Sequence, residues 1–480
     1  MKNQKGRSIS VVDTTLRDAH QCLWATRMTT AHMLPIADKM DNIGFERIDI
    51  AGTIQFDVCV RFLKENPWER LRLMRDKLQK TPMSSFTRSK SIMSFDFVPD
   101  DIVELWVERL VANGCRVVGA FDGLNNVDNM LVTINAARKL GARTLGAVSY
   151  GLSPVHTDEV YVKTVTDLVQ RGQVDAIWIK DAGGLLTVDR IRTLIPELRK
   201  AVGTVPIELH SHCMTGIAPL VYLEGIQAGA DCVHTSIAPL ANGNAQPATQ
   251  STVSNLRALG YNIDVDDGLI EQVGDHFRRV AEHEGKPLGQ VQEYDAFHYE
   301  HQLPGGMLAN FRVQLADLKM SHKFQEVLEE CARVRKELGY PILITPFAQF
   351  VGTQAVMNVL HGERYKVVPD EVKKYALGYY GSLLAPVEAE VMDRIISNGS
   401  PGIGMQPQPL EPAVDRLRKQ YPSMSDDERV LRFMYAGNQV DTMLAGGAMK
   451  TEYEFEAPLV RLVRELADRK YSKVYFGSAG

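Results

Sequence analysis

At residues 205 to 216 the chain reads Val205-Pro-Ile-Glu-Leu-His-Ser-His-Cys-Met-Thr-Gly216. This stretch predicts a mostly apolar strand that ends in His210 and His212. Side chains two residues apart lie on the same face of a strand, so both imidazoles should point the same way. Two imidazoles placed like this can hold one metal ion. A His-x-His pair alone is also found among ordinary polar positions at a strand end, so that interpretation stays open here.

Two other β-type runs end in side chains that can bind metals or anions. Residues 175–184 run through an apolar segment to Lys180, and residues 9–18 run through another to Arg17 and Asp18. Three expected strand ends therefore offer a carboxylate, a lysine and two imidazoles. Such a set is typical of a functional site.

Short β-branched runs alternate with longer segments of helical period through the first part of the chain. The expected strands are Ser10 to Thr14, Phe45 to Ile50, Met83 to Thr87, Arg116 to Phe121, Thr144 to Tyr150, Ala176 to Lys180, Pro206 to His210 and Cys232 to Ser236. The expected helices between them include Thr30 to Ile43, Asp101 to Asn113, Val127 to Leu140, His156 to Gln170, Asp189 to Ala201 and Ile217 to Ala228. Eight alternations over about 260 residues indicate an α/β fold, a (β/α)8 TIM barrel, with a doubly wound sheet as the alternative.

In a barrel of this kind the active-site residues sit at the carboxyl ends of the strands. The candidate residues that meet this condition are Asp18, Arg88, Asp122, Lys180, His210 and His212. We therefore expect residues 1–290 to form a metal-binding barrel domain.

Beyond residue 290 the alternation stops and helical segments rich in Glu, Arg and Leu follow. The clearest are Phe324 to Leu338, Phe350 to Leu360, Val372 to Tyr379 and Asp427 to Tyr435. Pro386 and the Gly/Pro-rich segment 398–412 interrupt them, the latter as an expected surface linker. Residues 291–480 are expected to form a mainly helical C-terminal domain that covers the barrel mouth.

The composition is that of an ordinary globular protein and excludes several classes of partner. The net charge is −5 without a run of Lys or Arg, so neither nucleic acid nor an anionic membrane is a favoured partner. No apolar stretch of about twenty residues and no signal peptide is found, so we expect a cytoplasmic protein. The six cysteines contain no C-x-x-C pair and are interpreted as reduced thiols.

Several motifs in this order resemble the carboxyltransferase component of biotin-dependent enzymes. That group includes the carboxyltransferase domain of pyruvate carboxylase, the alpha subunit of oxaloacetate decarboxylase and the pyruvate-side subunit of transcarboxylase. The matching stretches are Asp13-Thr-Thr-Leu-Arg-Asp-Ala-His-Gln21, Ala25-Thr-Arg-Met28, Phe62-Leu-Lys-Glu-Asn-Pro-Trp-Glu-Arg-Leu71, Ser153-Pro-Val-His156, Lys180-Asp181, His210-Ser-His212, Gln302-Leu-Pro-Gly-Gly-Met307, Thr345-Pro346, Val351-Gly-Thr-Gln-Ala-Val356 and Gly362-Glu-Arg-Tyr365. The resemblance covers about residues 8 to 390.

The resemblance implies a divalent metal bound by Asp18, His210, His212 and Lys180, with Lys180 carbamylated by carbon dioxide. An ammonium group cannot bind a cation, whereas a carbamate is an anionic oxygen ligand. Mixed nitrogen and oxygen ligands suit zinc, manganese or cobalt. A salt bridge between Lys180 and Asp181 or another carboxylate at the barrel mouth is the alternative interpretation.

The resemblance also implies roles for four residues around that metal. The metal would stabilise the enolate of a small 2-oxo acid, and Arg17 and Gln21 would support the enolate and orient the ketone. Arg88 would pair with the substrate carboxylate, and the Thr345 hydroxyl would carry a proton between biotin and substrate. Without the resemblance, Arg88 is a surface charge and Thr345 a turn residue.

The chain departs from the family pattern around the expected metal centre. The altered positions are Ser89-Lys90-Ser91, Phe95, Gly119 where an arginine is usual, Cys213 and Phe347-Ala348. These departures leave two interpretations open: a substrate other than pyruvate, or neutral drift in a pyruvate enzyme.

The segment Ala448-Met449-Lys450 resembles the tripeptide around a biotinylated lysine, but only thirty residues follow it. A carrier domain needs about thirty-five residues of β-barrel on each side, so biotin is expected on a separate carboxyl carrier protein. Other expected partners are a biotin carboxylase subunit and a second copy of this chain in a homodimer or larger complex. The sequence thus predicts a biotin-dependent carboxyltransferase for pyruvate or oxaloacetate. A metal-dependent aldolase or lyase and an inactive scaffold subunit are the alternatives.

Overall fold

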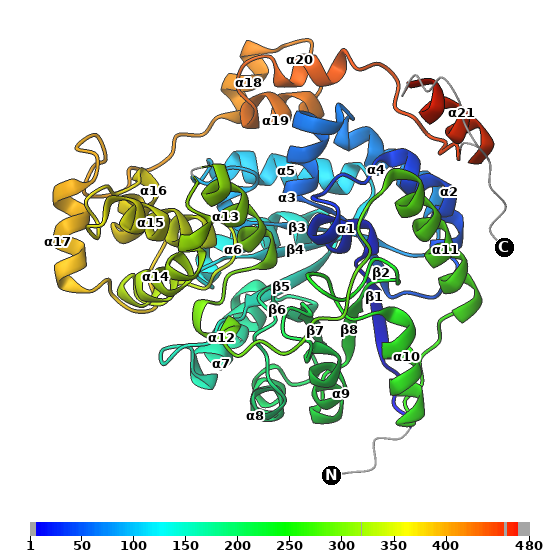
Figure 1. Ribbon diagram of the computed structural model, residues 1–480, viewed down its shortest axis with the longest axis horizontal. Coiled ribbons are helices and arrows are strands. Elements are labelled where there is room, and N and C mark those ends of the chain that lie inside the picture. Colours follow the sequence, from blue (N-terminus) through cyan, green and yellow to red (C-terminus); the bar gives the residue numbers. More distant parts are fainter. Residues whose placement is uncertain (1–5, 318, 456–457, 469–480) are drawn as a thin grey trace.

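Eight parallel strands close into a barrel in sequence order, with helices around it (Figure 1). The computed structural model describes residues 6–317, 319–455 and 458–468. The strands are β1 (Ser10–Asp13), β2 (Arg47–Gly52), β3 (Met83–Thr87), β4 (Cys115–Phe121), β5 (Arg143–Ser149), β6 (Ala176–Asp181), β7 (Ile207–Ser211) and β8 (Cys232–Thr235). The predicted (β/α)8 barrel is confirmed, and the doubly wound alternative is wrong because β1 pairs with β8.

In the described residues eleven α-helices surround the barrel, and six of them begin and end within three residues of the predicted bounds. The eleven are α1 (His20–Leu23), α2 (Thr30–Met40), α3 (Thr53–Val58), α4 (Pro67–Lys77), α5 (Asp100–Ala112), α6 (Val127–Lys139), α7 (Asp158–Asp167), α8 (Val188–Val202), α9 (Ala218–Ala228), α10 (Thr249–Ala258) and α11 (Asp267–Glu284). Helix α8 shows why: the Thr187 side chain accepts a hydrogen bond from the Arg190 amide at its start, and Gly203 ends it. A π-helical turn, Thr15–Ala19, carries Arg17 and Asp18 directly after β1.

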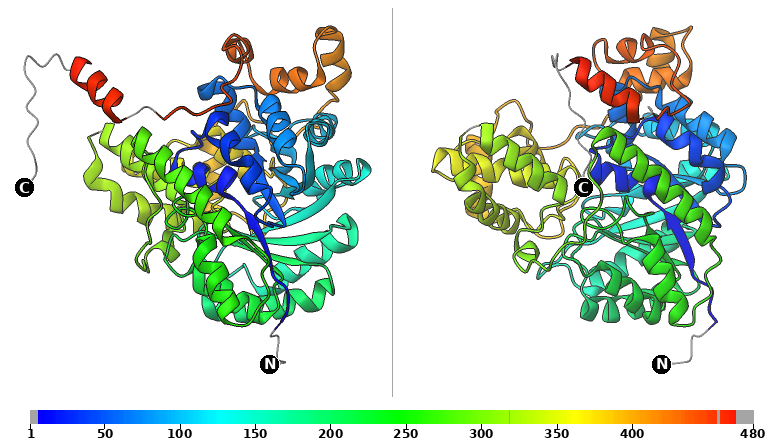
Figure 2. Two further views of the ribbon diagram at one scale, coloured as in Figure 1. Left: turned by 90° about the vertical axis from the view of Figure 1, so that its right-hand side faces the viewer. Right: turned by 45° about the vertical axis from the view of Figure 1, so that its right-hand side comes forward.

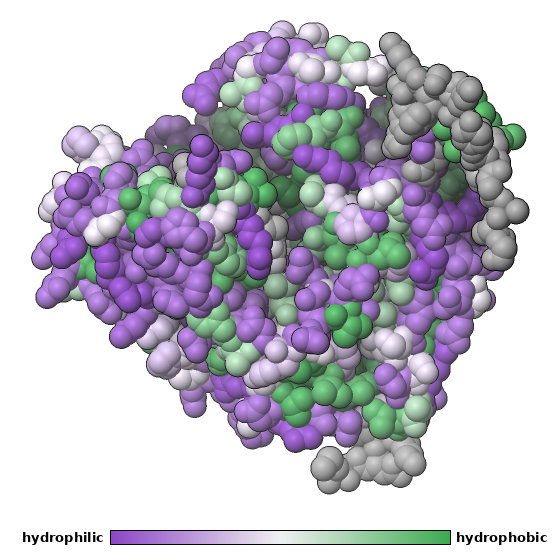
Figure 3. All heavy atoms as spheres, viewed as in Figure 1, coloured by the Kyte–Doolittle hydropathy of each residue, from purple (hydrophilic) through white to green (hydrophobic). Residues whose placement is uncertain are grey.

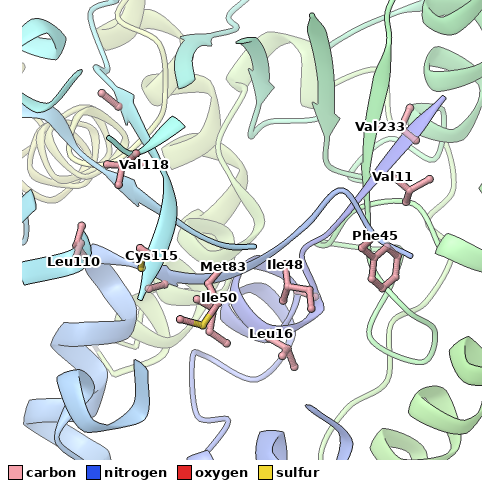
Figure 4. Packing of buried hydrophobic residues seen from close by; sticks show 14 of the residues in the cluster. Val11, Leu16, Phe45, Ile48, Ile50, Met83, Leu110, Cys115, Val118 and Val233 are labelled. Carbon is pink, nitrogen blue, oxygen red and sulfur yellow. The ribbon is translucent and has the colours of Figure 1, made fainter. Parts of the chain in front are cut away.

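The strands separate two packing regions. Their outward side chains, among them Val11, Ile48 and Ile50, pack against the helices in the main core (Figure 4). Inside the barrel, Phe86 and Trp178 belong to a small apolar cluster supplied by β3 to β6. On the opposite side the interior is polar, because buried charged residues project inward from β2, β7 and β8.

A second hydrophobic core belongs to a helical unit beside the barrel (Figure 2, right). Its helices are α12 (His298–His301), α13 (Gly305–Asp317), α14 (Phe324–Glu337), α15 (Phe347–His361), α16 (Asp370–Ala376) and α17 (Ala389–Asn398). Hydrophilic side chains dominate its visible surface (Figure 3). Helix α15 starts three residues before the predicted Phe350, with Pro346 at its N-cap position.

The last helices return to the barrel. Helices α18 (Val414–Gln420), α19 (Asp426–Met434) and α20 (Gln439–Leu444) lie over the barrel helices in Figure 1. Their apolar side chains, such as Leu431 and Met443, join the barrel core instead of the second core. The helical part of the chain therefore consists of two packing groups, and the boundary near residue 290 stays a prediction.

Helix α21 (Pro458–Asp468) follows the segment Ala448-Met449-Lys450. No strand flanks that tripeptide in the described residues. Within the same described ranges, no helix is both long and apolar enough to cross a membrane.

Candidate active site

Three of the predicted metal ligands meet at the carboxyl ends of the strands. The Asp18 Oδ2 atom lies 3.0 Å from His210 Nε2 and 3.3 Å from His212 Nε2. The two Nε2 atoms are 3.3 Å apart. All three side chains are buried. The prediction that both imidazoles point the same way agrees with this geometry.

The second nitrogen of each imidazole has its own partner. His212 Nδ1 donates to the carbonyl oxygen of Asn244 at 2.6 Å, and His210 Nδ1 lies 3.3 Å from His234 Nδ1. The Nε2 atom of each histidine therefore faces Asp18 Oδ2, as expected for a histidine that binds a metal. One carboxylate and two imidazoles fit a zinc-like divalent ion in donor chemistry.

Gln246, in the loop after β8, adds a contact that the sequence did not reveal. Its Nε2 donates to Asp18 Oδ2 at 2.8 Å and lies 3.1 Å from His212 Nε2. The Thr14 hydroxyl contacts its Oε1 at 2.9 Å, which fixes the direction of the amide. The amide therefore holds the Asp18 carboxylate in place.

The Lys180 side chain lies beside Asp18, His210 and His212. In the register of β6 and β7 it pairs with His210, and its Nζ lies 4.8 Å from the centroid of the Trp178 ring. Burial lowers the pKa of Lys180 to about 8. The charged form is therefore less favoured than in an exposed lysine.

Among the described residues Lys180 forms no salt bridge, neither with Asp181 nor with another carboxylate at the barrel mouth. The Asp181 carboxylate instead accepts hydrogen bonds from the amides of Leu185 and Leu186, at 2.8 and 2.9 Å, and from the Ser211 hydroxyl at 2.7 Å. These partners stabilise the turn after β6. The Asp181 carboxylate therefore has a structural role. Lys180 lies next to the candidate metal centre.

Arg17 is fixed between two carboxylates. Its guanidinium contacts Asp18 Oδ1 at 2.9 Å and, from β2, Asp49 Oδ2 at 2.5 Å. Gln55 in α3 donates to Gln21 Oε1 at 3.2 Å and to the Arg17 carbonyl oxygen at 3.1 Å. Arg17 and Gln21 therefore belong to one connected network with the candidate ligands.

Arg88 is not the surface charge of the alternative interpretation. It is buried after β3, and one end of its guanidinium donates to the Ser94 carbonyl oxygen at 2.7 Å. Its Nε has no hydrogen-bond partner among the described residues. Burial lowers the pKa of Arg88 to about 10. A buried cation with an unused donor is suited to an anionic ligand.

Steric contact explains why a glycine, Gly119, stands in β4 where the family usually has an arginine. A Cβ atom at Gly119 would lie 2.0 Å from Cε1 of Phe86. The Phe86 ring packs against Trp178 with centroids 4.1 Å apart. The Phe86 ring therefore occupies the volume that a side chain at position 119 would need. This wall of the barrel interior is apolar as a result.

Thr345 lies outside the barrel, on a segment that packs against the strand ends. Its neighbours Ile344 and Phe347 pack against Gly123 after β4, and Ile342 packs against Gly151 after β5. Thr345 itself is half-buried. The helical unit therefore reaches the barrel mouth at this segment, and the role of Thr345 stays a prediction.

A parallel barrel with converging carboxylate and imidazole groups at its strand ends defines the class of (β/α)8 enzymes with a candidate metal centre. Residues 124–276 match a family described as "HMGL-like", and residues 299–453 match one described as "Conserved carboxylase domain".

Curated relatives and solved structures are more specific. A subunit of the pyruvate carboxylase of Methanocaldococcus jannaschii is 44% identical over 84% of this chain and 71% of that protein. The "2-oxoglutarate carboxylase large subunit" of Hydrogenobacter thermophilus is 34% identical over 82% of this chain and 60% of that protein. The carboxyl transferase domain of Rhizobium etli pyruvate carboxylase, solved with pyruvate, superposes with a TM-score of 0.83 at 26% identity, over 92% of this chain and 77% of that one. The chain belongs to the family of biotin-dependent carboxyltransferases and is an enzyme of that class.

Proposed function

We propose that this chain transfers a carboxyl group between carboxybiotin on a separate carrier and a small 2-oxo acid, with pyruvate and oxaloacetate as the default pair. The observation that carries the proposal is the convergence of Asp18, His210 and His212 at the strand ends of a carboxyltransferase-family barrel. Its expected partners are a carboxyl carrier protein, a biotin carboxylase subunit and a second copy of this chain.

Asp18, His210, His212 and a carbamylated Lys180 would hold the metal. When bound, a zinc, manganese or cobalt ion would act as a Lewis acid that withdraws electron density from the keto oxygen. The pairing of Lys180 with His210 across β6 and β7 supports the fourth ligand, because both side chains enter from neighbouring strands at the same level.

The remaining polar groups would bind and orient the substrate. Arg17, which is fixed by Asp18 and Asp49, would support the negative charge that develops on the enolate oxygen. Gln21 would orient the ketone. The planar fork of Arg88 would pair with the substrate carboxylate, since its Nε is buried and unused.

The Thr345 hydroxyl would move one proton. When oxaloacetate loses its carboxyl group, the carbon–carbon bond breaks and its electron pair forms the enolate of pyruvate. The carboxyl group goes to the biotin ureido nitrogen, and the proton leaving that nitrogen passes through Thr345 to the enolate carbon. The half-buried position of Thr345 on the segment over the barrel mouth supports this role.

Two observations favour a related substrate as a second candidate. Phe86 fills the space at Gly119, and one relative is named as a 2-oxoglutarate carboxylase. The altered wall supports a 2-oxo acid other than pyruvate. The aldolase or lyase and the inactive scaffold are not favoured, because the relatives are carboxylases.

Decarboxylation of 3-carboxy-2-oxo acids, with and without free biotin, tests the proposal. We expect biotin-dependent turnover, a loss of about 10²–10⁴-fold in Thr345→Ala, and recovery in Thr345→Ser, which keeps the hydroxyl. Turnover indifferent to biotin would contradict the proposal in favour of a lyase. A metal-bearing protein that is inert toward oxaloacetate and its longer homologues would contradict it as well.

A further inference from the structure

A buried ion pair crosses the polar half of the barrel interior. Arg47 on β2 donates to both carboxylate oxygens of Glu208 on β7, at 2.8 and 2.5 Å, and both side chains are fully enclosed. The desolvation of two such charges offsets most of their attraction, so a buried ion pair is poor evidence of a stabilising role. Its other contacts are therefore more informative.

Those contacts lead directly to the candidate metal centre. His234 Nε2 lies 2.9 Å from Glu208 Oε2, and His234 Nδ1 lies 3.3 Å from His210 Nδ1. His210 Nε2 is then 3.0 Å from Asp18 Oδ2. A continuous chain of contacts thus joins Glu208, His234 and His210 to the point where the ligands converge.

The donors and acceptors in this chain of contacts determine which ring nitrogen of His234 and of His210 carries a proton. Glu208 is held on both oxygens by a guanidinium, so it is an acceptor, and His234 must present Nε2–H to it. A neutral His234 then has a bare Nδ1, which accepts a hydrogen bond from His210 Nδ1–H. His210 is left with a bare Nε2, the form that can bind a metal.

The opposite arrangement is less favourable. Arg47 also lies 3.2 Å from His234 Nε2 and could donate to it, which would reverse both tautomers. That pattern would place two acceptors, His234 Nε2 and Glu208 Oε2, face to face at 2.9 Å. A His210 Nε2 that binds a cation carries no proton, and the charge-assisted contact to Glu208 then decides in favour of the first arrangement.

The Trp178 ring packs against both histidines in this chain of contacts. It stacks on His234 at a centroid distance of 5.2 Å and meets the edge of His210 at 5.0 Å. With this apolar ring beside them, the Nδ1 atoms of the two histidines have only each other as hydrogen-bond partners among the described residues.

We propose that His234 is a positioning residue, fixed by Glu208 and Arg47, that holds His210 in the Nδ1–H tautomer with Nε2 free for the metal. The inference rests on the proposed function, because it assigns His210 as a ligand. It adds a residue on β8 and an ion pair on β2 and β7 to the machinery of the site.

Two nearly isosteric variants of His234 separate hydrogen bonding from packing. His234→Asn keeps an oxygen that can accept from His210 near the place of the imidazole Nδ1, whereas His234→Leu has a similar shape and no acceptor. Metal affinity is measured with Zn²⁺ and Mn²⁺ in competition with a chromophoric chelator. We expect affinity to fall about 10–100-fold in His234→Leu and to stay near the wild-type value in His234→Asn. Equal losses in both variants, or no loss in either, would overturn the inference.

Nitrogen-15 spectra of labelled histidines in metal-free Asp18→Ala, in which no carboxylate oxygen faces His210 Nε2, give an independent readout. We expect a proton on Nδ1 of His210 and on Nε2 of His234. The reversed tautomers would overturn the inference. This result does not depend on whether His234→Leu folds. If the wild type binds neither metal while these tautomers are found, the proposed function fails and the positioning role of His234 stands.

Discussion

At the scale of single residues, Arg17, Arg47 and their carboxylate partners at the site each contact at least one group of opposite charge. Asp18 is paired with Arg17, Arg17 also with Asp49, and Arg47 with Glu208. All of these groups are buried, so the loss of one partner leaves a charge without compensation. The barrel interior therefore tolerates the removal of a whole pair better than the removal of half of it.

The variants Glu208→Met and Arg47→Met/Glu208→Met test this statement. Glu208→Met should lower the free energy of unfolding by about 3–5 kcal/mol, because Arg47 stays buried and unpaired. The double variant should lie much closer to the wild type. Urea denaturation monitored by circular dichroism gives both values, and a double variant as unstable as the single one would contradict the argument.

The sequence predicted the residues of the site that end a strand or match a motif. His210 and His212 share a strand face, so period-two reasoning was sufficient for them. Lys180 and Asp18 follow two other apolar runs, and the family resemblance implied their roles. Asp49, Gln246 and His234 could not be found in this way, because their roles depend on which strands become neighbours. The inward direction of alternate β2 residues was the only available signal for Asp49.

At the scale of elements, β3 and β4 are fitted to each other through one ring. Phe86 occupies the volume that a side chain at Gly119 would need, and it also packs on Trp178. The sequence showed that an arginine was missing from β4. It could not show that a ring from the neighbouring strand fills the space, because that depends on the pairing of Phe86 with Gly119 across the sheet.

Gly119→Ala should therefore be destabilising. Its Cβ would lie 2.0 Å from Phe86, and overpacking of this kind costs about 1–3 kcal/mol. The double variant Phe86→Leu/Gly119→Ala should recover part of the loss. Gly306→Ala in α13 is the control, because a Cβ there has no heavy atom within 4 Å and alanine favours a helix. Thermal or urea unfolding would refute the steric account if Gly119→Ala were as stable as the control.

At the scale of the whole molecule, one carboxylate attaches α19 to the barrel helices. Asp427 accepts hydrogen bonds from Arg109 at 2.7 Å, Arg72 at 2.9 Å and Asn113 at 3.0 Å. Its carbonyl oxygen accepts from Trp68 at 2.9 Å. The sequence indicated the helix but not this attachment, since Asp427 is one of several acidic residues at the helix start.

Asp427→Asn should loosen α18 to α20 while the barrel stays folded, because the amide carries no charge to balance Arg72 and Arg109. We expect faster hydrogen exchange across residues 414–444 and unchanged exchange in the strands, measured by mass spectrometry. Asp415→Asn on α18 is the matched control. Unchanged exchange in Asp427→Asn would show that apolar packing alone holds these helices.

The proposed carboxyl transfer depends on one cation shared by residues from the turn after β1 and from β7. The most direct test is the metal content of the protein after removal of all metal by chelation and reconstitution with Co²⁺ or Zn²⁺. We predict one tightly bound ion per chain in the wild type, and its loss in Asp18→Ala and in His210→Ala but not in Asp415→Ala. A wild type that binds no ion, or an Asp18→Ala variant that binds it as tightly as the wild type does, would contradict the account.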